Sequence, residues 1–485
     1  MCGGTVMATL MELMASEKRT ENGAFARNTT FNAIVNLFAV AGALRNRNSD
    51  DIIEMWKDAF NEDAEIAFKM LFYIRNIRGG LGERNTFRVL LKYVATNYPD
   101  FVMANLDNIV FYGRYDDLFV LLDTPIENYV YEYIKEQLVT DSNADENEPI
   151  SLLAKWMPSI NTSSDKTRQL AYKFCNALNY SPAEYRKLLS RLRKKLDVLE
   201  VNMSANNWSN INYSSVPALA MNKSSNAFYN RDHDRFIKYI EDVKNGKTTI
   251  NSGTLYPYDL VHKIFNNENE VAEQQWKNMP DYFNGRTFNA LVMADVSGSM
   301  LGRPIETSIG LAIYFAEHNT GVFANSYLTF TSTPNIVTIK PNKSLYEKVN
   351  CVKLKGIGYD TNLESAFNRV LDTAICNNVP KEDMPESIIV ISDMEINDFG
   401  QNTSFLSYMK TKFNDAGYEL PKLVWWNVNA RSNTFHADTD DNTQFISGSS
   451  ASAFESLISG KTLSAIELVV NTLKDYDRVI IPEQY

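Results

Sequence analysis

The spacing of apolar residues divides this chain into two stretches of different character. Up to about residue 285, apolar positions recur mostly three and four residues apart, which is the spacing of an amphipathic helix. The run Ala64-Glu-Ile-Ala-Phe-Lys-Met-Leu-Phe-Tyr-Ile-Arg75 is an example. From near Phe288 onward, short continuous apolar runs alternate with amphipathic segments. The pattern therefore predicts an all-helical domain over residues 1–285 and an α/β domain over residues 286–485.

In the first stretch we expect a succession of helical hairpins. Helices are predicted over residues 64–75 and 85–98, a helix–turn–helix over 107–122, and further helices between 152 and 199. Polar segments interrupt them: an acidic loop over 141–148 and an irregular Asn- and Ser-rich segment over 204–225. Stacked helical hairpins are typical of solenoids, although no clean repeat period is visible. The prediction is a solenoid-like domain.

In the second stretch, strands and helices alternate. Strands are predicted over residues 289–294, 326–330, 387–392 and 423–426, and helices over 304–318, 363–376, 404–416 and 463–474. This alternation predicts a parallel sheet covered by helices on both faces, which is a doubly wound α/β fold.

Five oxygen-bearing side chains stand where such a sheet binds ligands. The first predicted strand runs into Asp295-Val-Ser-Gly-Ser299, Thr361 begins a helix after a loop, and the strand ending Ile-Ile-Val-Ile-Ser stops at Asp393. Ligands of open α/β sheets bind at the carboxyl ends of strands, where the strand order reverses. If the strands before Asp295 and Asp393 are neighbours there, these side chains converge.

The chemistry of this set indicates a hard cation. Carboxylate, hydroxyl and water oxygens suit Mg²⁺ best, and Mn²⁺ or Ca²⁺ are also compatible. Because only two of the five side chains carry a charge, the bound cation keeps an affinity for an acidic ligand, such as a Glu or Asp of a protein partner or a phosphate.

The pattern resembles the metal-ion-dependent adhesion site of von Willebrand factor A domains. The signature of that site is Asp-x-Ser-x-Ser, then a loop Thr, then a strand-end Asp, which this chain matches with Asp295, Ser297, Ser299, Thr361 and Asp393 in that order. The resemblance implies that these five residues hold the metal. One position departs from the family, because Asp360 stands where Gly often precedes the Thr; turned inward, its carboxylate would weaken the binding of acidic ligands.

A helical domain followed by such an α/β domain resembles the Ro autoantigen family, whose TROVE-type helical module binds RNA. The segment Ile74-Arg-Asn-Ile-Arg-Gly-Gly-Leu-Gly-Glu-Arg84 is similar to a glycine–arginine turn of that module. The chain is more similar to a family of uncharacterised proteins with the same domain pair, found in plants, bacteria, large viruses and phages. The segments that carry this second resemblance are Tyr112-Gly-Arg-Tyr-Asp-Asp-Leu118, Met203-Ser-Ala-Asn-Asn-Trp208, Asn212-Tyr-Ser-Ser-Val-Pro217, Leu255-Tyr-Pro-Tyr-Asp-Leu260 and Trp426-Asn-Val-Asn-Ala-Arg431.

The Ro-like relation implies a small structured RNA as a partner, and arginines that fork onto phosphates are its natural contacts. The candidates are Arg75, Arg78, Arg84, Arg114, Arg186, Lys187, Arg191, Arg193, Lys194 and Lys195. A structural interpretation stays open. Gly can serve the backbone of the turn, Glu83, Asp116 and Asp117 can neutralise nearby arginines, and the basic helix alternates leucines with its charges like any amphipathic surface helix.

Composition narrows the class of protein. The net charge of −11 and the pI of about 5.1 argue against a protein that coats nucleic acid through bulk charge. Four scattered cysteines and four isolated histidines form no zinc or disulfide pattern. No run of about 18 apolar residues predicts a membrane span, and the N-terminus lacks the features of a secretory signal. We expect a cytoplasmic protein without a membrane partner.

Two functions remain open, and neither is enzymatic. The first is a ribonucleoprotein-type binding scaffold whose helical domain holds RNA while its metal site holds an acidic protein ligand. The second is a protein-only interaction or assembly factor, as in a virus, without nucleic acid. A metal-dependent enzyme acting on phosphates is the least favoured possibility, because no general base is positioned by the sequence.

Overall fold

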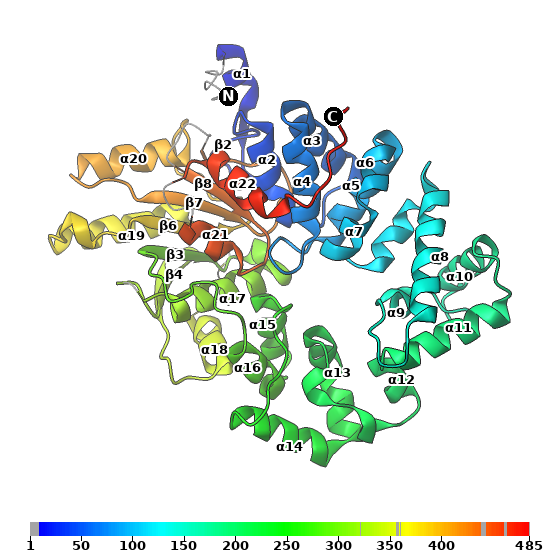
Figure 1. The fold of residues 1–485 in the computed structure, drawn as a ribbon. Helices are drawn as coiled ribbons and strands as arrows, with labels where there is room; N and C mark the ends of the chain where they lie inside the picture. The colour runs from blue at the N-terminus through cyan, green and yellow to red at the C-terminus, as the bar shows by residue number, and fades with distance from the viewer. Residues whose placement is uncertain are drawn as a thin grey trace. The chain divides into compact units, whose positions relative to one another are not determined.

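The structure is a computed structural model that describes residues 9–320, 322–355, 358, 360–437, 443–459 and 463–484 (Figure 1). Contacts between Cα atoms divide the chain into two compact units. Unit 1 consists of Met1–Thr86 and Ser252–Asp475, and unit 2 consists of Phe87–Asn251 and Tyr476–Tyr485.

A six-stranded sheet forms the centre of unit 1. Its strands in spatial order are β5 (Asn335–Thr338), β4 (Ser326–Phe330), β3 (Ala290–Asp295), β6 (Ser387–Ser392), β7 (Lys422–Asn427) and β8 (Thr443–Ser447). Five of them run parallel, and β5 pairs with β4 in the antiparallel direction. Every residue of β3 and β6 is buried, as expected for central strands covered on both faces. The α/β prediction is confirmed, with the correction that the sheet is mixed.

Helices pack on this sheet from distant parts of the chain. Helix α17 lies against β3, β4 and β6, α19 lies against β4, and α2 lies against β7 and β8. The helices of unit 1 are α1 (Leu10–Ser16), α2 (Ala33–Val40), α3 (Ser49–Glu62), α4 (Ala64–Arg75), α15 (Pro257–Phe265), α16 (Asn269–Lys277), α17 (Arg303–His318), α18 (Leu345–Lys355), α19 (Leu363–Cys376), α20 (Phe405–Asp415), α21 (Ala453–Ser459) and α22 (Ala465–Leu473). A short hairpin, β1 (Glu17–Arg19) with β2 (Phe25–Arg27), precedes α2.

The first helices belong to unit 1 because α2 uses the edge of the sheet as its packing surface. Gly42 lies so close to Gly448 that a Cβ atom on Gly42 would stand 2.6 Å from the Cα of Gly448. The Ser447 hydroxyl donates to the carbonyl of Phe38 and accepts the N–H of Gly42, both at 2.9 Å. The compact units therefore differ from the two sequence stretches 1–285 and 286–485, which describe the type of secondary structure.

Unit 2 is built of helices. Helix α5 (Arg84–Asn97) leads into it, and α6 (Pro99–Ala104), α7 (Leu106–Tyr112), α8 (Glu127–Asn143), α9 (Leu153–Trp156), α10 (Asp165–Ala177), α11 (Pro182–Lys195), α12 (Leu199–Ser204), α13 (Ala218–Arg231) and α14 (His233–Lys244) follow. The C-terminal segment returns to this unit: Arg478 Nε donates to Asn108 Oδ1 at 2.7 Å, and the Ile480 N–H donates to Asn105 Oδ1 at 3.0 Å.

Strongly periodic segments have the predicted boundaries. Helices α4 and α19 and strands β4 and β6 coincide with the predicted ranges. Short or polar elements do not: β5 and β8 were not predicted, because neither is a continuous apolar run.

Three predictions in unit 2 need correction. The second helix of 107–122 is a 3₁₀ helix, Tyr115–Leu121. The segment predicted as irregular over 204–225 contains the start of α13. The acidic loop begins later than predicted, because Asp141 lies in α8, is buried and accepts hydrogen bonds from the N–H and hydroxyl of Ser151.

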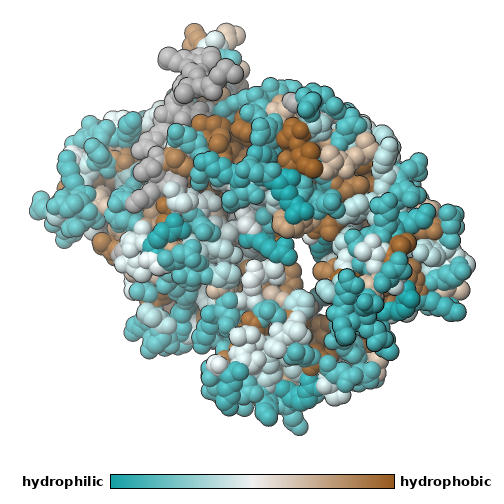
Figure 2. Space-filling view, viewed as in Figure 1, coloured by the Kyte–Doolittle hydropathy of each residue, from teal (hydrophilic) through white to brown (hydrophobic). Residues whose placement is uncertain are grey.

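The surface visible in Figure 2 is largely hydrophilic, and the hydrophobic residues on that face form separate patches. Among the described residues, no helix is both long enough and apolar enough to span a bilayer.

Candidate functional site

The strand order of the sheet reverses between β3 and β6. The chain proceeds from β3 outward to β4 and β5, and from β6 outward in the other direction to β7 and β8. Strands β3 and β6 are parallel neighbours over five residue pairs, from Ala290 opposite Ser387 to Ala294 opposite Ile391. The prediction that the strands before Asp295 and Asp393 are adjacent is confirmed. Both aspartates therefore stand at the same carboxyl edge of the sheet.

The loop after β3 is organised by Asp295, whose side chain is fully buried. One carboxylate oxygen accepts the N–H of Ser297 at 2.9 Å, and the other accepts the hydroxyl of Ser392 at 2.7 Å. The hydroxyl oxygens of Ser297 and Ser299 are 3.1 Å apart. Ser297 is buried and Ser299 is exposed, so this pair leads from the interior to the surface.

Thr361 and Asp393 come to the same rim from separate segments. Ser297 forms a parallel bridge with Gly358, three residues before Thr361. The backbone of Thr361 exchanges two hydrogen bonds with Asn397: its N–H donates to the Asn397 side chain at 3.2 Å, and its carbonyl accepts the Asn397 N–H at 3.0 Å. The Ser299 hydroxyl acts on Asp393 by lowering the pKa of its carboxyl group, against the larger opposite effect of burial. The structure thus brings the segments that carry the five predicted residues to the same rim of the sheet.

Two buried carboxylates make this rim electronegative. Burial, and secondarily the charge of Asp393, raise the pKa of Asp295 to about 7. Burial also raises the pKa of Asp393, although the guanidinium of Arg431 opposes that shift. Since hydroxyl and carboxylate oxygens are the donors that hard cations prefer, the residues present fit a divalent cation. The donor set is not of the multi-carboxylate kind: among the described residues no three His, Cys, Asp or Glu side chains form a metal-binding group.

Asp360 does not extend this negative charge inward. Its side chain is exposed and accepts the hydroxyl of Ser332 at 2.8 Å. The departure from the family pattern therefore places a carboxylate on the surface, bound to a neighbouring loop.

Arg431 is a charged residue of this rim that the sequence analysis did not assign to the site. It follows β7, and its guanidinium donates to Asp393 Oδ2 at 2.8 Å and to Glu21 Oε2 at 2.6 Å. The segment ending at Arg431 was recognised only as a family resemblance. Its position shortly after a parallel strand was the signal that could have placed it at the carboxyl edge.

The glycine–arginine turn, predicted to contact RNA, has structural contacts. Gly82 has φ +66°, and a Cβ atom there would stand 1.9 Å from the hydroxyl of Tyr256. Glu83 is buried and accepts hydrogen bonds from Arg45 at 2.6 Å and Arg303 at 3.5 Å. Glu83 therefore holds the start of α17, the helix that follows the Asp295 loop, and not the arginines of its own turn.

The arginine candidates of this region differ in accessibility. Arg75 is only 4% exposed, so it does not present its guanidinium to a phosphate. Arg78 and Arg84 are exposed. Arg114 is committed to Asp116, to which Nη2 donates at 2.8 Å, and stacks over the ring of Trp156 at 4.0 Å.

Helix α11 separates its basic residues into two groups. Arg193 reaches back to the carbonyls of Ala154 at 2.8 Å and Met157 at 2.7 Å, and Lys195 donates to the carbonyl of Ala144 at 3.0 Å. The remaining four lie on one face of the helix and are exposed: Arg186, Lys187, Arg191 and Lys194. Only this second group presents basic charge outward.

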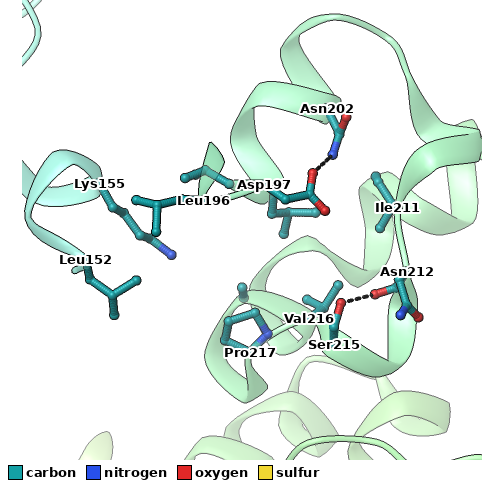
Figure 3. A pocket seen from close by; sticks show the side chains of 13 residues that line it. Leu152, Lys155, Leu196, Asp197, Asn202, Ile211, Asn212, Ser215, Val216 and Pro217 are labelled. Atoms are coloured by element: carbon teal, nitrogen blue, oxygen red, sulfur yellow. Dashed lines mark hydrogen bonds between the residues drawn. The ribbon is translucent and has the colours of Figure 1, made fainter. Parts of the chain in front are cut away.

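A cavity of about 270 Å³ lies beyond the C-terminal end of α11, within unit 2. Figure 3 shows Lys155 and Leu152 on one side and Val216 with Pro217 on another. Its acidic residue is already bound, because Asn202 donates to Asp197 at 2.8 Å. The segment Asn212-Tyr-Ser-Ser-Val-Pro217 forms one wall of the cavity. This segment is one of those that carry the resemblance to the uncharacterised family, so here the resemblance corresponds to a structural feature of unit 2.

Comparison with known proteins gives two family matches that meet near residue 285. Residues 20–122 and 132–284 match the family described as Domain of unknown function (DUF2828), and residues 289–479 match Domain of unknown function (DUF7788). The chain is 30% identical over 511 residues to the "Uncharacterized protein L728" of Acanthamoeba polyphaga mimivirus, covering 96% of this chain and 88% of that protein. A similar solved structure is the Ro (RSR) protein of Deinococcus radiodurans, with a TM-score of 0.46 and 11% identity over 93% of this chain and 99% of that chain.

Proposed function

Since the chain belongs to the family of the Domain of unknown function (DUF2828), which covers more than half of its length, we propose a function from its own residues: it is a non-enzymatic binding protein that captures an acidic partner through a divalent cation. The α/β part of unit 1 would be a von Willebrand factor A-type domain. The observation that carries the proposal is the meeting of the Asp295, Thr361 and Asp393 segments at the strand-order reversal.

Asp295, Ser297, Ser299, Thr361 and Asp393 would hold the cation, with Mg²⁺ as the ion that suits these donors best. When bound, the cation would supply a positive centre that attracts an oxygen ligand of a partner. Ser299 is the exposed member of the set, so the ligand would approach from its side. A carboxylate on a partner protein fits this position, because the site offers no more than two formal negative charges of its own.

Mn²⁺ titration followed by electron paramagnetic resonance tests the cation site. We expect one binding site per chain in the wild-type protein, with competition by Mg²⁺, and its loss in the double variant Ser297→Ala/Ser299→Ala. Asp360→Asn is the matched control, since Asp360 is bound to Ser332 and should leave the Mn²⁺ affinity unchanged. Equal affinity in the wild type and the double serine variant would refute the proposal.

A second function, RNA binding by unit 2, is favoured by one observation. Arg186, Lys187, Arg191 and Lys194 form an exposed basic face on α11, and no ion pair of these four is seen among the described residues. Such a face can contact phosphates of a small structured RNA. Four other candidates are less suited, because Arg75 is buried and Arg114, Arg193 and Lys195 are held by hydrogen bonds within the protein.

Fluorescence anisotropy with a labelled RNA hairpin over a salt series tests this second function. The double variant Lys187→Gln/Arg191→Gln should weaken binding and make the logarithmic salt slope shallower by roughly one to two. Lys238→Gln/Lys244→Gln, two exposed lysines on α14 of the same unit, is the control with the same loss of charge. Absence of RNA affinity at low salt would instead favour a protein-only interaction factor.

A further inference from the structure

Building on the proposed cation site, we infer that Arg431 sets its affinity: the divalent cation and the Arg431 guanidinium compete for Asp393, and Glu21 receives the guanidinium when the cation binds. Arg431 would thus act as a built-in cation that an incoming metal ion has to displace.

The contacts of Asp393 leave little room for a second cation. Its side chain is completely buried, and Oδ2 accepts Arg431 Nη2 at 2.8 Å. The other oxygen, Oδ1, accepts the N–H of Glu395 at 3.2 Å. A metal ion bound through Asp393 has to share the carboxylate with the guanidinium or take its place, and two cations on one buried carboxylate repel each other.

Glu21 offers the guanidinium an alternative position. Its Oε2 accepts Arg431 Nη1 at 2.6 Å, so Arg431 bridges the two carboxylates. The side chain of Glu21 is 55% exposed, whereas that of Asp393 is 0% exposed. Arg431 can therefore give up its bond to Asp393 and keep its bond to Glu21 by a change of its own side-chain torsions.

The position of Glu21 is fixed by the loop that follows Asp393. The N–H of Glu21 donates to Glu395 Oε2 at 2.7 Å, and the side chain of Asn22 donates to the Glu395 carbonyl at 2.6 Å. The Thr20 hydroxyl donates to the Ile396 carbonyl at 2.8 Å. Because residues 20–22 are bound to the same loop as Asp393, the second acceptor for Arg431 is held in place beside the first.

Two substitutions at Arg431 test the competition. Removing the positive charge in Arg431→Gln should tighten Mn²⁺ binding at least tenfold in calorimetric titration, whereas Arg431→Lys, which keeps the charge, should stay within about threefold of the wild type. If Arg431 served only to hold the loop in its fold, the Gln variant would instead bind Mn²⁺ more weakly or equally.

Glu21 distinguishes exchange of a partner from simple electrostatics. Glu21→Gln should weaken Mn²⁺ binding in the wild-type background. Of the two side chains that accept from Arg431, only Asp393 then carries a charge, so the guanidinium stays on Asp393. In the Arg431→Gln background the same change should have no effect. An effect of equal size in both backgrounds would show that Glu21 acts through space, and the exchange would be refuted.

Arg19→Gln is the matched control for these variants. Arg19 lies in the same hairpin, is half exposed and bonds to the carbonyl of Gly23 at 3.1 Å, so its loss removes equal charge without touching Asp393. Its Mn²⁺ affinity should match that of the wild type. If neither the wild type nor Arg431→Gln binds Mn²⁺ in a manner that needs Ser297, the proposed cation site itself fails; if both bind it equally well, only the role of Arg431 fails.

Discussion

The glycine–arginine turn offers a test of whether a sequence motif serves the fold or a ligand. In Gly82→Ala the new methyl group meets two costs. The backbone at φ +66° disfavours an L side chain by about 1–2 kcal/mol. The added Cβ would also stand 1.9 Å from the hydroxyl oxygen and 3.0 Å from Cζ of Tyr256, whose ring is buried.

The second cost is an overpacking cost. A core that has to move a buried ring loses about 1–3 kcal/mol, so Gly82→Ala should lower the free energy of unfolding by roughly 2–5 kcal/mol in total. Gly285→Ala in the same unit isolates the backbone cost, since Gly285 has φ +70° and nothing within 4 Å of its Cβ position. That control should lose only about 1–2 kcal/mol.

Urea denaturation followed by tryptophan fluorescence measures the difference between these variants. Adding Tyr256→Phe to Gly82→Ala removes the closest atom and should restore part of the lost stability, while contacts with the ring at 3.0–3.3 Å remain. A cost of Gly82→Ala no larger than that of Gly285→Ala, or no recovery of stability by Tyr256→Phe, would contradict a role of this glycine in packing. If the turn were needed only for RNA binding, Gly82→Ala would weaken RNA binding and would cost no more stability than Gly285→Ala.

Three further predictions concern stability and the assignment of charged residues. Burial lowers the pKa of His436 to about 4. Below about pH 6.5 the folded state therefore binds fewer protons than the unfolded state, so the free energy of unfolding is highest above that pH and falls by about 3 kcal/mol toward pH 4. His436→Gln should flatten this decline when urea midpoints are measured across pH. Arg193→Ala should lower the free energy of unfolding of unit 2 by about 2 kcal/mol, because its three hydrogen bonds to α9 and to the segment after it are lost. The control Arg191→Ala removes an exposed arginine of the same helix and should change this free energy by less than about 0.5 kcal/mol. Equal effects of the two substitutions would contradict the division of the basic helix into a bound and an exposed group. Saturating Mg²⁺ at about 100 times its Kd should stabilise the wild type by about 2.7 kcal/mol, and a thermal shift that persists in Ser297→Ala/Ser299→Ala would contradict binding at the proposed site.

The carboxyl-edge cluster was predictable because its signal is local at each position. Asp295 and Asp393 each end a strongly apolar strand, Thr361 precedes the strongly periodic helix α19, and parallel strands place their ends on one side of the sheet. The same locality explains why α19 and β6 have their predicted bounds. Elements with a weak pattern, such as the edge strands β5 and β8, are stabilised mainly by their neighbours, so their sequences carry little information about them.

Charge pairing was not predictable in this way. The basic helix 186–195 carries six Lys and Arg residues, yet Arg193 and Lys195 bind backbone carbonyls while Lys187 and Arg191 are exposed. Glu83 pairs with Arg303, 220 residues away, and not with the arginines beside it. Which cation meets which acid depends on where helices dock, and that is a property of the packed chain.

By itself, the sequence determined the periodicity of the helices, the order of the apolar strands and the oxygen-rich residues at their ends, because these follow from backbone geometry and from burial of apolar surface within each element. Only the tertiary structure decided that α2 covers the edge of the sheet, that Gly82 lies beneath Tyr256, and that Arg431 joins Glu21 to Asp393. Each of these contacts joins segments 170 residues or more apart, except for the bond between Arg431 and Asp393, which spans 38 residues. Such contacts depend on how well whole surfaces fit together, and no short sequence pattern encodes that fit.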